Sequence, residues 1–306
     1  MPYLWMIAGS FFTAWMGQLA HLLKDECDWR IVALFRGGLA FIFSLLFVRL
    51  SGARLIVWRP AALWLRGIAS SISLLCTFYA LSRLPTSEVM TLTNTFPIWV
   101  AFLSWPLFRI APSLSVWLAA LCGVIGVALI ESPHFGGESG SSLAIGLAVV
   151  SAATSAVAML GLHRIQGVAP WAIVAHYSGV ATIVVAGAWY VGQPPDVGNL
   201  GTPATLYLLL GVGVAATLGQ LCVTRAFTSG PPGRLAVVGL TQILFALGLD
   251  LLFDPRTVSS TMLVGIAFIL LPTAWMLMVR RTGPNARTQT TTQNGAARRM
   301  NVASLR

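Results

Sequence analysis

The sequence has few charged residues and lacks the short motifs of several large enzyme classes. Charged side chains make up 9% of its 306 residues, whereas 57% of the residues are apolar. Soluble domains carry about 25% charged residues, and the mean hydropathy here is +0.80. The chain contains no GxxxxGK(S/T) phosphate loop, no GxSxG turn and no HExxH helix. This balance indicates a membrane protein that does not hydrolyse ATP.

Cysteine and histidine are also scarce. The four cysteines form no CxxC pair, and three of them lie within apolar runs. They are expected to be small core residues rather than a disulfide or metal framework. The four histidines are scattered along the chain, so no paired acid and base, activated nucleophile or metal cluster is evident. We therefore expect no metal, no cofactor and no enzymatic site.

Long apolar runs dominate the chain instead. A membrane-spanning helix needs about 20 mostly apolar residues, and the chain offers ten such runs. We predict an all-α polytopic membrane protein with ten transmembrane helices, at residues 3–23, 31–50, 65–81, 88–108, 113–130, 143–163, 171–191, 204–224, 235–253 and 261–279. No basic residue precedes the first run, so we expect it to stay in the membrane rather than to be removed as a signal peptide.

The basic residues are distributed unevenly between the two sides of the predicted membrane. With the N-terminus in the cytoplasm, 14 arginines fall in cytoplasmic segments. The opposite side holds four cations, Lys24, Arg30, Arg83 and Arg256, and all nine acidic residues are external or within spans. This asymmetry places both termini in the cytoplasm. Topology and anionic lipid therefore explain the net charge of +10, and no nucleic-acid partner is expected.

The chain divides into two similar halves. Residues 132–142 are rich in glycine and serine and are predicted to link a first repeat, 1–131, to a second repeat, 143–281. Each half has five spans, an odd number, so the second copy enters the membrane from the opposite side. Such inverted repeats are typical of secondary transporters. Residues 282–306 are polar and are predicted to be a disordered cytoplasmic tail.

Polar residues recur at helical spacing on the first, third, fourth, sixth and eighth predicted helices. A polar face at membrane depth is costly unless it lines a cavity or contacts protein. The candidate substrate-binding residues of a central cavity are Thr13, Gln18, Ser73, Thr77, Thr91, Asn94, Thr95, Trp99, Ser155, Thr217, Gln220 and Gln242. The alternative is that these groups bond a neighbouring helix or their own backbone, and that the small ones serve close packing.

Two charged residues lie more than two residues inside the ends of the predicted spans. Arg36 is about 8 Å from the external end of its helix, and Asp250 is near the external end of the ninth helix. Charges at such depth usually pair or face water. The two residues are candidates for pairing with each other or for binding a charged substrate, and Asp250 is also a candidate for carrying a coupling proton. Alternatively, both are interfacial anchors.

The stretch from 79 to 130 carries a family resemblance. Its features are Ala80-Leu81, Leu84-Pro85, a helix ending at Phe96-Pro97, and a later span with Ala119, Gly123 and Gly126. This order resembles the repeat unit of the drug/metabolite transporter superfamily, EamA branch. The resemblance implies a cavity lined mainly by the helices with polar stripes and the ninth helix.

Pro97 frees the carbonyl of Thr93, four residues earlier. It has no counterpart in the second half, where the matching residues are Gln242-Ile243. The freed carbonyl is a candidate acceptor for a solute, and a kink that serves only packing is the alternative.

These observations favour a secondary transporter that moves a small organic metabolite by alternating access. An amino acid, a nucleoside-type compound or an amine is the expected substrate class, and exchange, facilitated diffusion and proton coupling stay open. The alternative is a membrane-embedded enzyme, such as a transferase acting on lipid. The expected partners are a small-molecule substrate and the bilayer, with a homodimer as an open option. The expected location is the inner cell membrane, as a multi-pass protein.

Overall fold

The computed structural model describes residues 1–23, 26–55, 58, 60–81, 83–84, 86–109, 111–131, 142–165, 167–191, 200–253 and 259–278. All regular secondary structure in these ranges is helical. The predicted disordered tail lies outside the described residues. So does the predicted linker, apart from Ser142, which begins a helix.

Twelve helices make up the described part of the chain. They are α1 (Pro2–Leu22), α2 (Trp29–Leu50), α3 (Ala61–Leu81), α4 (Thr86–Thr93), α5 (Phe96–Phe108), α6 (Leu114–Glu131), α7 (Ser142–Arg164), α8 (Pro170–Val191), α9 (Pro203–Ser229), α10 (Pro232–Gly239), α11 (Thr241–Phe253) and α12 (Ser260–Met278). Proline begins α1, α8, α9 and α10, where its missing N–H costs no helical hydrogen bond.

Eight helical segments are long and apolar enough to cross a membrane: α2, α3, α6, α7, α8, α9, the consecutive pair α10 and α11, and α12. Two of the ten predicted spans are not among them. Polar side chains such as Gln18 and His21 reduce the hydropathy of α1. The span predicted at 88–108 is divided into α4 and α5, neither of which alone is long enough.

Two helices are interrupted, one in each half of the chain. Asn94 and Thr95 separate α4, of 8 residues, from α5, of 13 residues. Leu240 separates α10, also of 8 residues, from α11, also of 13 residues. Pro97 lies in the first turn of α5. Because proline has no N–H, the helical hydrogen bond from residue 97 to the carbonyl of Thr93 is missing at this interruption. The second half is interrupted at the matching position, although Pro97 has no counterpart there.

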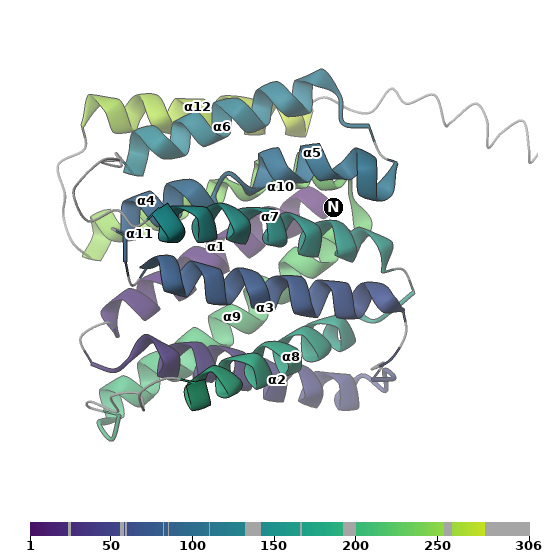
Figure 1. The fold of residues 1–306 in the computed structure, drawn as a ribbon, viewed down its shortest axis with the longest axis vertical. Helices are drawn as coiled ribbons and strands as arrows, with labels where there is room; N and C mark the ends of the chain where they lie inside the picture. The colour runs from purple at the N-terminus through teal and green to yellow at the C-terminus, as the bar shows by residue number, and fades with distance from the viewer. Residues whose placement is uncertain are drawn as a thin grey trace, which may run out of the picture.

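The helices run side by side across Figure 1, with α6 and α12 at one edge and α2 and α8 at the other. Between these edges α1 packs mainly against α9, and α3 packs mainly against α7. Smaller contacts join α1 to α11, α7 to α5, α2 to α9 and α3 to α8. The central helices therefore contact helices from the other half of the chain more than their own sequence neighbours.

The edge pair α6 and α12 is held at very short range by two glycines. A Cβ on Gly126 would lie 2.7 Å from the carbonyl oxygen of Gly265, and a Cβ on Gly265 would lie 2.7 Å from that of Gly126. No side chain fits at either position without separating the helices. Small residues at a crossing are the usual means of close approach in membranes.

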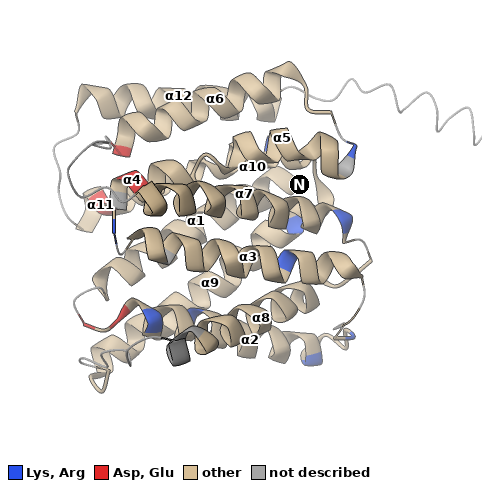
Figure 2. Cartoon of the chain, in the orientation of Figure 1, with Lys and Arg blue, Asp and Glu red and all other residues tan. Residues whose placement is uncertain are grey.

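Charge is unevenly distributed between the two ends of the bundle. Figure 2 shows the acidic residues of the described chain at the end opposite the N-terminus, while arginines lie at both ends. The end that carries the N-terminus holds the largest apolar cluster, built from α1, α3, α5, α7, α8, α9 and α10. Phe227 and Leu160 are completely buried within it. This cluster closes the bundle at the N-terminal end.

Candidate functional site

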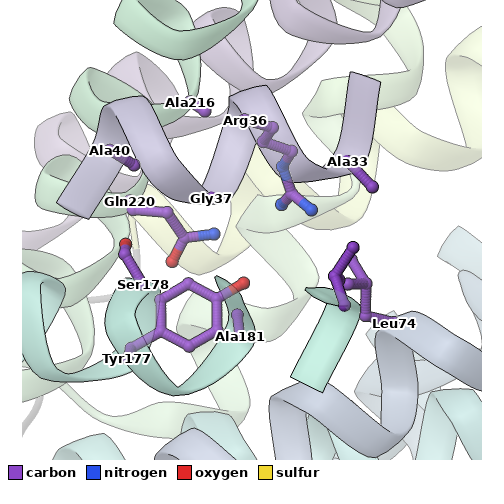
Figure 3. Close-up of a pocket in the computed structure, with 11 residues that line it drawn as sticks. Ala33, Arg36, Gly37, Ala40, Leu74, Tyr177, Ser178, Ala181, Ala216 and Gln220 are labelled. Carbon is purple, nitrogen blue, oxygen red and sulfur yellow. The ribbon is translucent and has the colours of Figure 1, made fainter. Parts of the chain in front are cut away.

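A small polar pocket lies among α2, α3, α8 and α9. Its volume of about 20 Å³ is room for about one water molecule. Figure 3 shows Arg36, Gln220 and Tyr177 reaching toward this space from α2, α9 and α8. The lining residues are Ala33, Arg36, Gly37, Ala40, Leu74, Tyr177, Ser178, Ala181, Val185, Ala216 and Gln220.

Arg66, on α3, forms the polar layer next to this pocket and is only 2% exposed. Its Nη2 donates to Oε1 of Gln220 at 2.9 Å, and its Nη1 donates to Oγ of Ser70. Its Cζ lies 4.5 Å from the ring centroid of Tyr177, in cation–π range. Nε of Arg66 is buried and has no hydrogen-bond partner. Two pocket residues, Gln220 and Tyr177, are thus positioned by a buried cation.

The backbone of α8 approaches α2 and α3 through glycine. A Cβ on Gly37 would lie 2.8 Å from Oγ1 of Thr182. A Cβ on Gly67, next to Arg66, would lie 3.4 Å from the side chain of Val180. The two glycines, each next to an arginine in the sequence, let the backbones of α2 and α3 approach the same stretch of α8. This close approach makes the pocket small.

Arg36 lines the pocket from α2, and its Nε donates to Sδ of Met16 at 3.2 Å. A thioether is a weak acceptor. Asp250 is half-buried on α11, a helix without substantial contact to α2. The structure therefore does not bring together the two charges that the sequence proposed as a pair.

Three predicted substrate contacts, Ser73, Thr77 and Ser155, instead meet at the interface of α3 and α7. Oγ of Ser73 lies 2.7 Å from Oγ of Ser155 and 2.9 Å from Oγ of Ser151. Oγ1 of Thr77 lies 2.6 Å from Oγ of Ser151. We call these four residues the hydroxyl cluster. Its members satisfy one another's hydrogen bonds between two closely packed helices.

Most of the remaining predicted hydroxyls bond their own backbone one turn earlier. Thr13 donates to Gly9 O, Thr91 to Ser87 O and Thr217 to Gly213 O, at 2.7–2.8 Å, and Thr95 donates to Leu92 O at 2.6 Å. This is the alternative that the sequence left open for such residues.

The amides and the tryptophan are placed differently. Nδ2 of Asn94 donates to Met90 O at 2.8 Å, at the end of α4. Gln18 is buried in α1, Gln242 is half-buried at the start of α11, and Trp99 packs against the N-terminal apolar cluster. Of the predicted candidates, only Gln220 and Arg36 line the polar pocket.

Arg66 and Tyr177 were missed from the sequence. Arg66 was assigned to the cytoplasmic side because it is only the second residue of the apolar run predicted at 65–81. In the structure α3 begins earlier, at Ala61, after Pro60. Proline just before a run is a helix-start signal, and it would have placed Arg66 in the second turn. No comparable signal marks Tyr177, since its role comes from contact with α3.

Comparison with known proteins identifies transporters. Residues 1–132 match the model of the EamA-like transporter family. The pseudopaline exporter CntI of Pseudomonas aeruginosa is 27% identical over 274 residues, which cover 87% of this chain and 93% of that protein. An uncharacterized transporter of Helicobacter pylori is 23% identical over 218 residues, which cover 67% of this chain and 69% of that protein.

A crystal structure of another protein has the same fold, with a TM-score of 0.76 at 15% identity. The match covers 89% of this chain and 95% of the other. Together with the family match, these relatives confirm the resemblance to the EamA branch. They also confirm a transporter, rather than an enzyme, that is a multi-pass integral membrane protein.

Proposed function

Because residues 1–132 match the EamA-like transporter family and the relatives are transporters, we propose that this chain is an EamA-type secondary transporter of the drug/metabolite transporter superfamily that moves a small organic metabolite by alternating access. Amino acids, nucleoside-type compounds and amines are the proposed substrate classes. Exchange, facilitated diffusion or proton coupling drives the transport cycle in this proposal.

The observation that carries the proposal is the pair of interrupted helices. Each half of the chain contains an 8-residue helix followed by a 13-residue helix. The two interruptions adjoin, since a Cβ on Gly239 would lie 3.4 Å from the ring of Phe96. Broken helices at matching positions of two halves are a feature of secondary transporters, whose solute sites they flank.

The packing of the helices supports two inverted repeats, 1–131 and 143–281, with both termini in the cytoplasm. A two-fold relation that exchanges the repeats would turn the contact of α1 with α9 into that of α7 with α3. The same relation maps α2 with α8, and α6 with α12, onto themselves. Each of these pairs is in close contact. The end at which the charged residues of the described chain are all basic would then be the cytoplasmic end.

The described conformation is closed around the solute site in this proposal. A pocket of about 20 Å³ is far smaller than the 300–1,000 Å³ of typical small-molecule sites. The cluster around Phe227 closes the N-terminal end. Alternating access requires that this cluster separate when the site opens toward the cytoplasm.

Among the predicted cavity residues, we propose that Gln220 and Arg36 contact the solute directly. Asn94 and Thr95 form the first interruption and Gln242 lies next to the second, and in this proposal their side chains supply further polar contacts to the solute. The relative that is named as an exporter spans most of this chain, which favours export as the direction of transport.

Counterflow in proteoliposomes tests this function. Vesicles containing the purified chain are preloaded in turn with amino acids, nucleosides, polyamines and organic cations, and uptake of each labelled compound is measured. We expect one class to accumulate. Asn94→Ala removes the amide that caps Met90 O and is expected to lower the rate severalfold. Thr154→Ala, at an exposed hydroxyl of α7 that bonds its own helix, is the matched control.

The outcomes separate the parts of the proposal. Equal rates in Asn94→Ala and the control would exclude the helix interruptions from the transport path. Absence of accumulation for every class, in vesicles whose protein remains folded, would contradict transport of these solutes.

A further inference from the structure

We propose that the transported solute carries a carboxylate, and that Arg66 and Arg36 bind this group. The inference rests on the proposed transport function and adds the chemistry of its substrate. It starts from two cations inside the bundle: Arg36 of α2 lines the pocket, and Arg66 of α3 contacts two of the lining residues, Gln220 and Tyr177.

Neither cation is neutralised by the protein. The groups that contact Arg66 are a hydroxyl, an amide and an aromatic ring. The partner of Arg36 is a thioether. Within the described residues no carboxylate pairs with either guanidinium. Buried charges in proteins are normally paired, so an anion from outside the chain is the missing partner.

The geometry around Arg66 is prepared for a planar anion. Nη1 and Nη2 are used by Ser70 and Gln220, while the buried Nε keeps an unsatisfied donor. Because Gln220 accepts from Arg66 through Oε1, its amide N–H groups stay available as donors toward the pocket. Figure 3 shows the hydroxyl of Tyr177 and the guanidinium of Arg36 beside the same space. Donors thus surround the pocket from several helices.

The size of the pocket favours a small group over a large one. About 20 Å³ holds about one water molecule, so the pocket would have to widen for either anion, and less for a planar carboxylate than for a tetrahedral phosphate. Arginine is also the residue that matches carboxylate geometry through two parallel hydrogen bonds. The remainder of the solute would occupy space that opens during the transport cycle.

A structural role for Arg66 is a poorer explanation. Desolvating a guanidinium is costly, and hydrophobic residues of similar volume often stabilise a core better than buried charges do. The hydrogen bonds of Arg66 do not require a positive charge, since a neutral donor satisfies Ser70 and Gln220 equally, and the cation–π contact with Tyr177 compensates a buried charge only in part. Binding of a negatively charged group does require a positive charge.

Ligand-dependent thermal unfolding of the purified full chain tests the site directly. The probes are matched pairs at constant ionic strength: lactate and lactamide, benzoate and benzamide, glutamate and glutamine. We expect a carboxylate, but not its amide, to raise the unfolding temperature saturably. Arg66→Gln and Arg36→Gln are each expected to weaken this binding by about tenfold to a hundredfold.

Two further variants guard against trivial results. Arg49→Gln, at an exposed position of the same helix as Arg36, should bind as wild type does. Arg66→Lys keeps the charge but loses the planar fork, and we expect intermediate affinity. If Arg66→Gln fails to fold, the carboxylate affinity of Arg66→Lys is the test at this position. Equal stabilisation by acids and amides, or unchanged affinity in both Arg66 variants and in Arg36→Gln, would overturn the proposal.

Further probes in the same unfolding assay distinguish the possible sources of the anion. Stabilisation by chloride or phosphate alone, or by phosphatidylglycerol nanodiscs but not phosphatidylcholine nanodiscs, would replace the solute by an inorganic ion or a lipid and overturn the proposal. Carboxylate binding without counterflow would contradict transport and leave the site standing. Counterflow of a solute whose carboxamide analogue is carried equally well would leave transport standing and overturn the site.

Discussion

The hydroxyl cluster and the small pocket beside Arg66, which we call the arginine pocket, both involve α3. They differ in whether the protein satisfies the polar groups that they contain. In the hydroxyl cluster Ser73 and Thr77 bond Ser151 and Ser155 of α7, at 2.6–2.9 Å, so the interface is complete without any ligand. In the arginine pocket Arg66 is equally buried, but its charge has only neutral partners and its Nε has none. One set of polar groups is complete and the other is incomplete.

This difference shows how a polar residue in a membrane helix is to be interpreted. Hydroxyls that satisfy one another connect helices, and such bonds contribute about 0.6 kcal/mol each on average. A charge that the protein leaves uncompensated lowers stability. It is expected to be retained for a ligand. The following predictions contrast stability with transport at the two places.

The largest effect is expected for Arg66→Met. The change removes the charge that would bind the solute, so transport should fall by about a hundredfold or more. The unfolding temperature should stay the same or rise. Relief from burying a guanidinium, worth several kcal/mol, offsets the about 1–3 kcal/mol lost by Ser70 and Gln220. Counterflow and thermal unfolding of the same preparation measure both quantities. A large loss of stability would instead make Arg66 a structural residue.

A smaller effect is expected for Gln220→Glu. The new carboxylate would lie where Oε1 of Gln220 now accepts from Arg66 at 2.9 Å, and would pair with the cation. We expect stability to rise by about 1 kcal/mol and affinity for carboxylate solutes to fall about tenfold. Ser113→Glu, which adds the same charge at an exposed serine away from the pocket, is the control. Wild-type carboxylate affinity in Gln220→Glu would argue against Arg66 as the anion site.

The smallest effect is expected for Ser151→Ala in the hydroxyl cluster. Ser151 is buried, and its Oγ bonds both Ser73 and Thr77. Its loss should lower stability by about 1 kcal/mol while the affinity for the solute changes less than twofold. Ser113→Ala, at an exposed serine, controls for the substitution itself. A drop in affinity with unchanged stability would place Ser151 in the solute path and remove the contrast with the arginine pocket.

The helical fold was predictable because long apolar runs leave few alternatives in a bilayer. The ranges for α2, α6, α7, α8 and α12 differ from the structure by only a few residues. A possible kink near Asn94 was indicated by Pro97, but the break into two helices was not. The break at Leu240 was not indicated either, because no local signal marks it. There Ser10 of α1 donates to Gly239 O at 3.3 Å, and a Cβ on Gly239 would meet Met6 at 2.7 Å.

The candidate site was predictable only in part. Helical spacing places Ser73 and Thr77 on one face, but spacing does not tell whether that face meets another helix or a pocket. Gln220, from a predicted polar stripe, and Arg36, from within a predicted span, both line the pocket. The role of Arg66 depends on contacts with α8 and α9, more than a hundred residues later in the chain. Sequence periodicity contains no information on such contacts.

In the proposed transport cycle, the uncompensated charge on α3 would also make the protein responsive to membrane voltage. A positive charge that moves through the whole field of a membrane changes in energy by about 2.3 kcal/mol per 100 mV. With the site empty, Arg66 and Arg36 feel this force. With a carboxylate bound, the net charge that feels it is reduced by one. The return of the empty carrier would then depend on voltage more strongly than the step that carries the solute.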